Sequence, residues 1–490
     1  MRIIPAPTDG VCPAPDSLSV AGPEWVEHVI DAVSISPLFP VARYDSSSAA
    51  LVIVDAPQDV QLVPSELPDS SYSLEVDENA IRIRCSEPAG LVAALRTLPS
   101  LRVEGGLSCV QIDDAPKFRY RGMHFDVARH FFDAAFVKRT ITLLASLGFN
   151  VLHWHLTEDQ GWRIPVSRHP RLTEVAAYRT EDDGSTYGGY YSHDEIRDVV
   201  RFAGLHGMLV MPEIELPGHA RAAIAAYPEL SCRQEQIGVW AEWGICEDVF
   251  CAGNDAVFDF LEDVFDDVVS LFPSRYVHIG GDECPKTRWK ECPKCQARIA
   301  GEGLKDEHEL QSYFVGRAAR ALEQRGRIAM GWDEILEGGL PEGTLVMSWR
   351  GTQGGIRAAE MGHDVVMTPT SHCYFDYRQV DDDTEIGFPH AQGGSRPPVL
   401  TARDVYTFDP LSGIAADAAP HVIGGQANVW TEQLDTPAKV EYMVAPRILA
   451  MAEVLWSAPV ERDYEEFRDR ARTWLTRLDA MNWNYAPLPE

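Results

Sequence analysis

The sequence predicts an α/β protein built around a (β/α)8 barrel, a TIM barrel, that is preceded by a small α+β domain. From Phe118 onward, short apolar strands alternate with amphipathic segments of ten or more residues, which is typical of βα units around a parallel sheet. An open doubly wound sheet is the alternative. It requires a glycine-rich phosphate loop after an early strand, which the sequence lacks. The expected strands are 121–127, 151–156, 208–215, 276–282, 328–332, 345–349, 365–369 and 422–430.

Amphipathic helices are expected between most of these strands, at 136–147, 194–206, 257–271 and 309–325 among others. Residues 1–112 are expected to form the small α+β domain, packed on a barrel that takes residues 113–490 together with C-terminal helices. This first part contains a candidate strand at 50–55, a hairpin at 72–84 and a helix at 88–98. It shows no chemical motif, so its expected role is packing.

The composition indicates a globular chain of enzyme size and excludes two classes of partner. The 490 residues include 43 basic and 74 acidic side chains, a formal net charge of -31, and 45% are hydrophobic. Such a negative field repels nucleic acid backbones and anionic membrane surfaces. No apolar run reaches the roughly 18 residues of a membrane span. Prolines interrupt the N-terminus before an apolar signal region, so a cytoplasmic location is expected.

The stretch Tyr276-Val-His-Ile-Gly-Gly-Asp-Glu283 gives the strongest indication of an active site. β-forming residues lead into paired glycines and then into two adjacent carboxylates. This pattern is typical of a buried strand that ends in closely approached backbone and a charged tip. An ordinary acidic turn has no need of paired glycines. Asp282 and Glu283 are therefore the candidate catalytic pair.

Polar and aromatic residues follow the other expected strands too, where a barrel enzyme places its active site. Three tryptophans stand at these strand ends beside carboxylates. Flat rings stack on the C–H faces of sugars while carboxylates accept hydroxyl protons, so the pattern indicates a carbohydrate site. The candidate residues are Glu158, Asp159, His219, Trp332, Trp349, Tyr374, Asp376, Trp430 and Glu432.

These residues resemble glycoside hydrolase family 20, the β-N-acetylhexosaminidases. The similarity covers the barrel almost completely, and residues 1–112 also resemble the domain that precedes the barrel in this family. The motifs that carry it are Arg121-Gly122 with Asp126-Val-Ala-Arg-His130, His153-Trp-His-Leu-Thr-Glu-Asp-Gln-Gly-Trp162, Pro212-Glu-Ile-Glu-Leu-Pro-Gly-His219, His278-Ile-Gly-Gly-Asp-Glu283 and Gly331-Trp-Asp333.

The resemblance implies an exo-acting, retaining hydrolase that releases terminal β-linked N-acetylglucosamine or N-acetylgalactosamine from an oligosaccharide or glycoconjugate. The 2-acetamido oxygen of the substrate forms an oxazolinium intermediate, so no protein nucleophile is needed. Glu283 is the expected general acid and base, and Asp282 is expected to hold and stabilise the acetamide. Adjacent strand residues point to opposite sides, which is expected to separate the two carboxylates. No cofactor and no catalytic metal are expected.

The resemblance also implies binding roles. Arg121 is expected to hold ring hydroxyls and Glu432 to accept from hydroxyls at the non-reducing end. His219 is expected to link the general acid to an acidic residue, either Glu158 or Asp159. The aromatic residues complete the site: Trp332, Trp349 and Trp430 as pocket walls and Tyr374 as donor to the acetamide oxygen, with Asp376 near the hydroxyls.

Two other functions are weighed against this one. A lacto-N-biosidase of the same family has a deeper pocket, and the presence of Arg121 and Glu432 favours a closed pocket for one sugar instead. A non-catalytic sugar-binding protein is expected to lack an acid such as Glu283, which is present. The oligomeric state is left open.

The cysteines raise a separate structural question. The pair in Cys292-Pro-Lys-Cys295 has the spacing of a zinc knuckle, while Cys284 lies beside the expected acid and Cys232, Cys246 and Cys251 precede it. One such pair is only half of a zinc site. Thiols without metal, or a local thiol pair, are therefore the favoured interpretation, and a structural zinc is the alternative.

Overall fold

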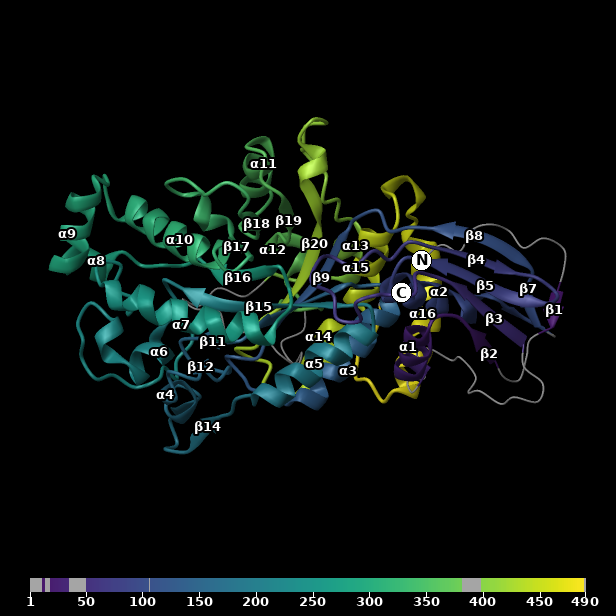
Figure 1. Cartoon of the computed structure of the whole chain (residues 1–490), viewed down its shortest axis with the longest axis horizontal. Helices are drawn as coiled ribbons and strands as arrows, with labels where there is room; N and C mark the ends of the chain where they lie inside the picture. Colours follow the sequence, from purple (N-terminus) through teal and green to yellow (C-terminus); the bar gives the residue numbers. More distant parts are fainter. Residues whose placement is uncertain (1–10, 14–17, 35–49, 105, 381–397, 489–490) are drawn as a thin grey trace.

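The computed structural model of the chain describes residues 11–13, 18–34, 50–104, 106–380 and 398–488. Within these ranges, eight parallel strands close into a barrel in the order β10-β15-β16-β17-β18-β19-β20-β9 (Figure 1). The predicted barrel is confirmed, and each predicted strand matches an observed one to within two residues at either end. The strands are β9 (Tyr120–Asp126), β10 (Val151–His155), β15 (Leu209–Leu216), β16 (Tyr276–Gly280), β17 (Ile328–Trp332), β18 (Leu345–Ser348), β19 (Val365–Met367) and β20 (Val422–Val429).

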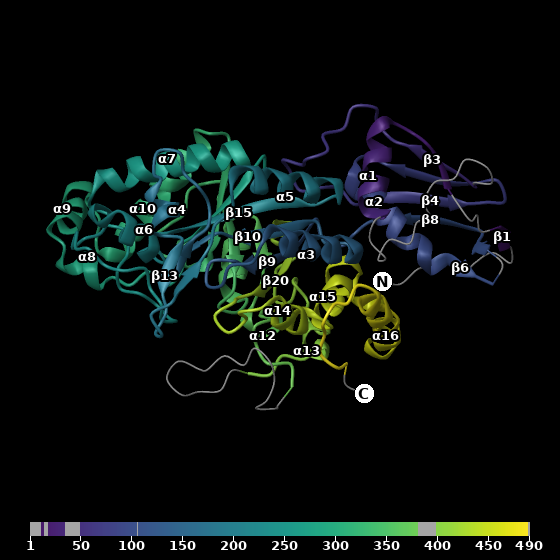
Figure 2. The ribbon, with the colours of Figure 1, turned by 90° about the horizontal axis from the view of Figure 1, so that it is seen from below.

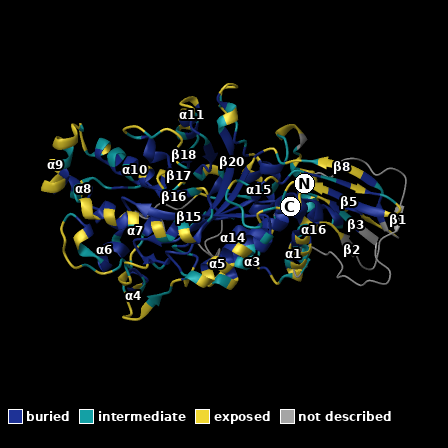
Figure 3. Ribbon diagram, in the orientation of Figure 1, coloured by how far each residue is buried: buried dark blue, intermediate teal, exposed yellow. Residues whose placement is uncertain are grey.

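Helices surround the barrel, and most of them bury one face and expose the other (Figure 3). Their ends follow local signals: Asp133 caps α3 by accepting from Phe136 N, and Ser192 and Glu195 form a capping box on α5. Strands β17 and β18 are joined by the 3-10 turn η3 (Asp333–Leu336) in place of a long helix. The main barrel helices are α3 (Ala134–Leu147), α5 (His193–Leu205), α7 (Asp255–Leu271), α10 (Glu307–Glu323), α11 (Gln353–Glu360), α13 (Ala402–Tyr406), α14 (Pro437–Val444) and α15 (Arg447–Trp456), with α16 (Tyr464–Ala480) following them.

Shorter elements decorate the loops at the C-terminal strand ends. Two small hairpins and a helix follow β10, a short helix follows β15, and two short helices follow β16. These are β11 (Thr157–Glu158) with β12 (Gly161–Trp162), α4 (Arg171–Glu174), β13 (Tyr178–Thr180) with β14 (Thr186–Gly188), α6 (Arg221–Ala226), α8 (Thr287–Glu291), α9 (Pro293–Glu302) and, after β19, α12 (Thr370–Cys373).

A five-stranded sheet of order β2-β3-β5-β4-β8 precedes the barrel. Helices α1 (Glu24–Ser34) and α2 (Pro88–Thr97) contact barrel helices α5 and α3, and they lie between this sheet and the barrel (Figure 2). The predicted boundary after residue 112 falls inside β8, and the division into two domains stays a prediction. The strands are β2 (Leu18–Ala21), β3 (Ala50–Asp55), β4 (Tyr72–Val76), β5 (Ala80–Cys85) and β8 (Val110–Asp114), beside a small sheet of β1 (Val11–Pro13), β7 (Gly106–Ser108) and β6 (Arg102–Val103).

The segment after β3 covers the N-terminal end of the barrel. Asn150 Nδ2, next to the start of β10, donates to Pro68 O (3.1 Å), and Arg275 N, before β16, donates to Ser65 O (2.7 Å). The opposite end of the barrel, where the strands finish, is therefore the end left for a site. In the described part of the chain, no helix combines the length and apolarity needed to cross a membrane.

The barrel interior has an apolar half and a polar half. The apolar half comprises Tyr120, Val151, Leu209, Met211, Met330, Leu345, Met347, Val366 and Ile423. Toward the C-terminal strand ends, fully buried polar side chains replace these residues. Trp332 Nε1 donates to Glu213 (3.0 Å), and ring nitrogens of His153 and His278 lie 2.9 and 2.7 Å from the same carboxylate. A buried charge needs such partners, and this layer forms the floor of the site.

Candidate active site

Paired glycines shape the loop that carries the two expected catalytic carboxylates. Strand β16 ends at Gly280, and Gly280 and Gly281 have φ of 63° and 95°. A Cβ on Gly280 would lie 1.7 Å from Oε2 of Glu215, and one on Gly281 would lie 2.4 Å from Cγ2 of Ile335. Any side chain at either position would collide with a neighbouring group. The close backbone approach expected from the sequence is confirmed.

Asp282 and Glu283 follow in the turn, outside the strand. Glu283 has φ 41°, a conformation that is uncommon for a residue with a side chain and that concentrates at functional sites. Oxygens of both carboxylates lie 3.7 Å from the same atom, Nε2 of His219. The expectation that strand alternation sends them to opposite sides is therefore wrong, because the strand ends two residues earlier and the turn brings them together.

His219 connects this pair to the loop after β10. Its Nδ1–H donates to Oε1 of Glu158 (2.7 Å), while Oδ2 of Asp159 is 3.6 Å away. Asp159 accepts instead from the backbone N–H of Arg221 (2.9 Å). Glu158 is thus the closer partner, a choice that the sequence left open. Burial alone would lower the pKa of His219, but the surrounding carboxylates, Glu158 first, raise it well above its ordinary value.

The carboxyl group of Asp282 is buried and incompletely paired. Burial raises its pKa to about 7, an effect that His219 opposes and Glu283 reinforces. Among the described residues, its Oδ1 atom has no hydrogen-bond partner. A buried acceptor without a donor is costly, so this oxygen is suited to receive an N–H from a bound molecule.

Arg121 is not part of the site, and its expected role in holding sugar hydroxyls is wrong. It is the second residue of β9 and lies at the N-terminal end of the barrel, 1% exposed. Its guanidinium donates to Gly148 O (2.7 Å), Phe118 O (2.8 Å) and Ser70 Oγ (2.6 Å). These contacts tie the segment that follows β3 to the base of the barrel, which is a structural role.

Arg129, and not Arg121, lies among the candidate site residues. It follows the end of β9, and its guanidinium lies 3.0 Å from Glu158, 3.5 Å from Asp126 and 3.9 Å from Glu432. The same group lies over the ring of Trp430, 4.8 Å from its centroid. A signal in the sequence was available, because a barrel site takes residues from the ends of strands and not from their beginnings.

The aromatic side chains form a connected wall. Trp332 and Trp430 have ring centroids 5.9 Å apart, Tyr374 and Trp430 6.5 Å, and Trp349 and Tyr374 6.1 Å with nearly parallel planes. Trp332 is buried on the floor, where Glu213 orients its indole, whereas Trp349 and Trp430 remain half-buried. The wall thus runs from a buried ring on the floor to half-buried rings nearer the surface.

Three further carboxyl groups border this wall. Glu334, which is not among the candidate residues predicted from the sequence, accepts from Trp349 Nε1 (2.9 Å). Burial, reinforced by Asp282, raises its pKa to about 9. Burial, reinforced by Glu432, raises the pKa of Asp376 to about 8. Glu334 and Asp376 are therefore mainly protonated at neutral pH and can donate as well as accept hydrogen bonds. The side chain of Glu432 is 33% exposed.

A (β/α)8 barrel that gathers paired carboxylates, an arginine and flat aromatic rings at its C-terminal end is typical of glycoside hydrolases. Residues 118–459 match the model of the glycosyl hydrolase family 20 catalytic domain, and the chain belongs to this family.

Named relatives agree with this assignment. A beta-hexosaminidase of Porphyromonas gingivalis is 45% identical over 438 residues, which are 86% of this chain and 56% of that protein. A beta-N-acetylhexosaminidase of Cellulomonas fimi is 35% identical, covering 89% of this chain and 84% of that protein. The crystal structure of the GH20 exo beta-N-acetylglucosaminidase of Vibrio harveyi with N-acetylglucosamine superposes with a TM-score of 0.84 at 30% identity, covering 98% of this chain and 77% of that one. The chain thus spans little more than half of the Porphyromonas relative.

Proposed function

We propose that this chain is an exo-acting β-N-acetylhexosaminidase, which releases terminal β-linked N-acetylglucosamine or N-acetylgalactosamine with retention through an oxazolinium intermediate. The observation that carries the proposal is the shared approach of Asp282 and Glu283 to Nε2 of His219, 3.7 Å from each. Retaining enzymes with a protein nucleophile place their acid and nucleophile on opposite sides of the scissile bond. Two carboxylates that meet at one imidazole nitrogen lie on the same side.

Three other carboxyl groups at the site, those of Glu334, Asp376 and Glu158, are poor candidates for a nucleophile. With pKa values of about 9 and 8, Glu334 and Asp376 are mainly protonated at neutral pH. Glu158 is ionised, because Arg129 and then His219 lower its pKa against the effect of burial, but it is already engaged by both. The nucleophile is therefore assigned to the substrate's own acetamido oxygen.

In the first step, Glu283 protonates the glycosidic oxygen while the acetamido oxygen attacks the anomeric carbon and the bond to the leaving group breaks. Asp282 accepts from the acetamido N–H through its free oxygen and stabilises the positive charge that develops on the ring. In the second step, the Glu283 carboxylate takes a proton from water, which attacks the anomeric carbon and reopens the ring with net retention.

The exo preference rests on Arg129 together with Glu432, 3.9 Å apart, in place of the pair expected from the sequence. Glu432 and the neighbouring Asp376 offer oxygens for hydroxyls at the non-reducing end, and Trp430 supports the guanidinium. A single terminal sugar suits this arrangement better than the disaccharide of a lacto-N-biosidase. The cytoplasmic location expected from the sequence stays a prediction, which fractionation of the source cells measures.

The experiment compares p-nitrophenyl β-glycosides of N-acetylglucosamine, N-acetylgalactosamine and glucose. Without an acetamide the plain glucoside has no internal nucleophile, so its kcat/KM is expected to be lower by at least about a thousandfold. A thiazoline analogue of the intermediate is expected to bind at least about a hundredfold more tightly than the substrate. Comparable rates on the glucoside and the N-acetylglucosaminide would refute the mechanism.

A further inference from the structure

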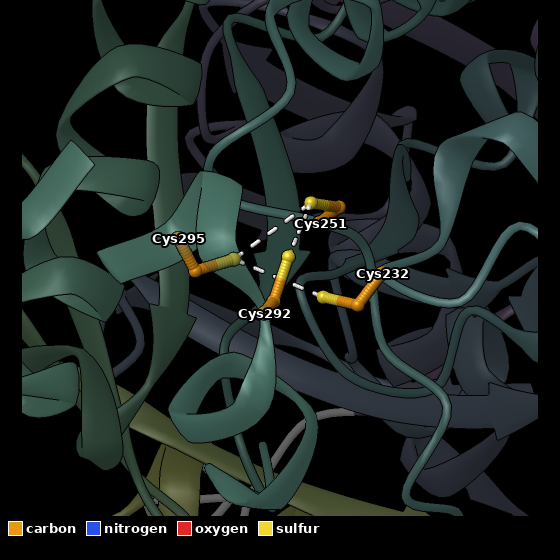
Figure 4. A group of neighbouring side chains, drawn as sticks. All are labelled: Cys232, Cys251, Cys292 and Cys295. Atoms are coloured by element: carbon orange, nitrogen blue, oxygen red, sulfur yellow. Dashed lines mark hydrogen bonds between the residues drawn. The ribbon is translucent and has the colours of Figure 1, made fainter. Parts of the chain in front are cut away.

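Four cysteine side chains converge beside the loop that carries the catalytic pair. Cys292 and Cys295 belong to the start of α9, and Cys232 and Cys251 come from the long connection between α6 and α7 (Figure 4). The Sγ atoms of Cys232 and Cys295 are 3.8 Å apart, those of Cys251 and Cys292 3.8 Å, and those of Cys251 and Cys295 3.7 Å. All four sulfur atoms lie within 4.8 Å of one another.

These separations match the edges of a metal-centred tetrahedron. With Zn–S bonds of about 2.3 Å, the edge of a regular tetrahedron of sulfur atoms is about 3.8 Å. A disulfide needs two sulfur atoms about 2.05 Å apart, and all four cysteines are free thiols in this structure. The four sulfur atoms therefore surround one common point and do not form two bonded pairs.

The backbone around the four thiols builds this arrangement. An antiparallel bridge between Ser231 and Phe250 holds together the two segments that carry Cys232 and Cys251, each of which follows one partner of the bridge. A Cβ on Gly253 would lie 2.1 Å from the carbonyl carbon of Lys294, so only glycine lets this turn approach the knuckle so closely.

The start of α9 also favours negative charge at this place. Cys292 occupies the N-cap of the helix and Cys295 lies in its first turn. The first N–H groups of a helix have no acceptor within it, and the helix dipole adds positive potential there. Thiolates, which metal binding requires, are stabilised at such a position.

We propose that Cys232, Cys251, Cys292 and Cys295 bind one structural Zn²⁺ ion. The sequence shows only one Cys-x-x-Cys knuckle and therefore favoured metal-free thiols. The fold replaces that interpretation, because it brings a second pair of cysteines to the knuckle from a segment about 40 to 60 residues earlier in the chain. Four protein thiolates complete the coordination of zinc and leave no position for water or substrate. The ion therefore takes no part in hydrolysis, and Cys284 and Cys246 stay outside the site.

The zinc would join two loops that frame the active site. The segment between Cys232 and Cys251 contacts the β10 loop, where Trp240 N donates to Asp159 O (3.1 Å) and Gln160 Nε2 donates to Glu242 O (2.7 Å). The knuckle lies nine residues after Glu283, and Trp289 Nε1 between them donates to Phe250 O (2.9 Å). Metal binding thus fixes the spacing between the Asp159 loop and the loop of the general acid.

The first test measures metal in untagged protein that is purified without chelators from zinc-supplemented cells. Plasma mass spectrometry is expected to give about one zinc per chain. The variants Cys292→Ser and Cys295→Ser are each expected to retain less than a fifth of it, whereas Cys85→Ser, a half-buried thiol in β5, keeps the full content. Equal zinc in the knuckle variants and the Cys85→Ser control would overturn the assignment, as would iron in place of zinc or a wild-type chain without metal.

A second test needs no variant to fold. An organomercurial that titrates the thiols of the wild-type protein is expected to release one zinc per chain, detected with a colorimetric chelator. Replacement by Co²⁺ is expected to give the absorption bands of a tetrahedral thiolate site. Peptide mass mapping under non-reducing conditions covers the competing outcome: a disulfide among these four cysteines, seen as peptides two mass units lighter than their thiol forms, would overturn the proposal. The hydrolytic activity is followed in parallel and can be retained or lost independently of the metal count.

Discussion

The Nδ1–H of His219 donates to Glu158 across 2.7 Å, and this contact leaves the opposite ring nitrogen facing the catalytic carboxylates. Nε2 lies 3.7 Å from Asp282 and from Glu283, so the imidazole transmits the orientation and charge set by Glu158 to both. Arg129 holds the other oxygen of Glu158 (3.0 Å). One chain of contacts therefore connects Arg129 to Glu283, the proposed acid.

Glu158→Gln is expected to lower kcat more than Asp159→Asn does. The amide cannot sustain the positive charge on His219, and losing a hydrogen bond to a charged group costs about 1.5–3 kcal/mol, or about 10- to 150-fold. Asp159 is 3.6 Å from Nδ1 and contributes less. Steady-state kinetics on an aryl N-acetylglucosaminide, with circular dichroism to verify folding, makes the comparison. A larger loss in Asp159→Asn would transfer the partner role to Asp159.

Glu283→Gln is expected to remove most hydrolysis of substrates with poor leaving groups and to spare those with good ones. Only a basic leaving oxygen needs protonation before the bond breaks. The measurement compares kcat for chitobiose, which has a poor leaving group, with kcat for a dinitrophenyl glycoside, which has a good one. The expected loss is at least about a thousandfold for chitobiose and less than about a hundredfold for the dinitrophenyl glycoside. Equal losses on the two substrates would contradict the assignment of Glu283 as the acid.

The pH dependence of kcat/KM is expected to follow the ionisation of the Asp282 carboxyl group. Its pKa is raised to about 7 by burial, so its carboxylate, the form that stabilises the oxazolinium charge, is present above that pH and lost below it. In the free enzyme kcat/KM should therefore rise as pH increases through about 7. The titratable groups that face Asp282 are His219, Glu283, Glu213, Glu158, Glu215, Glu334 and Tyr374.

The variant Asp282→Asn distinguishes the contribution of this carboxyl group to the pH dependence from the contributions of the neighbouring titratable groups. The variant is expected to lose the rise near pH 7 and to have a kcat lower by about a hundredfold or more, with KM changed much less, because the lost interaction strengthens only in the transition state. An Asn variant that keeps both the wild-type kcat and the rise near pH 7 would mean that Asp282 is only a structural residue of the turn.

The two arginines of the first motif are expected to behave in opposite ways. Arg129→Ala should still fold but lower kcat/KM by about 10- to 150-fold or more, because it removes the cation shared by Glu158 and Glu432. Arg121→Ala should lower the free energy of unfolding by about 2–4 kcal/mol, because buried carbonyls of Phe118 and Gly148 lose their donor.

Urea unfolding and kinetics on the folded variants measure both effects. The structural assignment requires the kcat/KM of Arg121→Ala, measured at low temperature, to stay within about threefold of wild type. A selective loss of substrate affinity in Arg121→Ala, with unfolding unchanged, would return this residue to the site.

The amino-acid sequence alone determined much of the barrel fold and part of the candidate site. The period of apolar residues placed all eight barrel strands to within two residues of their ends, because a barrel strand is buried on both faces and its run of β-forming residues stops where the strand stops. The glycines before Asp282 were equally informative, since only glycine tolerates the backbone approach to Glu215 at Gly280. Tryptophans beside carboxylates at the strand ends indicated a carbohydrate site.

Tertiary structure decided whatever depended on segments distant in sequence. It placed Arg129 at the site instead of Arg121. Arg121 lies near the start of β9 and Arg129 follows its end, and the motif alone does not show which end of the strand faces the site. It selected Glu158 over Asp159 through a distance of 2.7 Å against one of 3.6 Å. It also brought Cys232 and Cys251 to the knuckle at Cys292 and Cys295, since a closed barrel places the loops of neighbouring strands side by side whatever their separation along the chain.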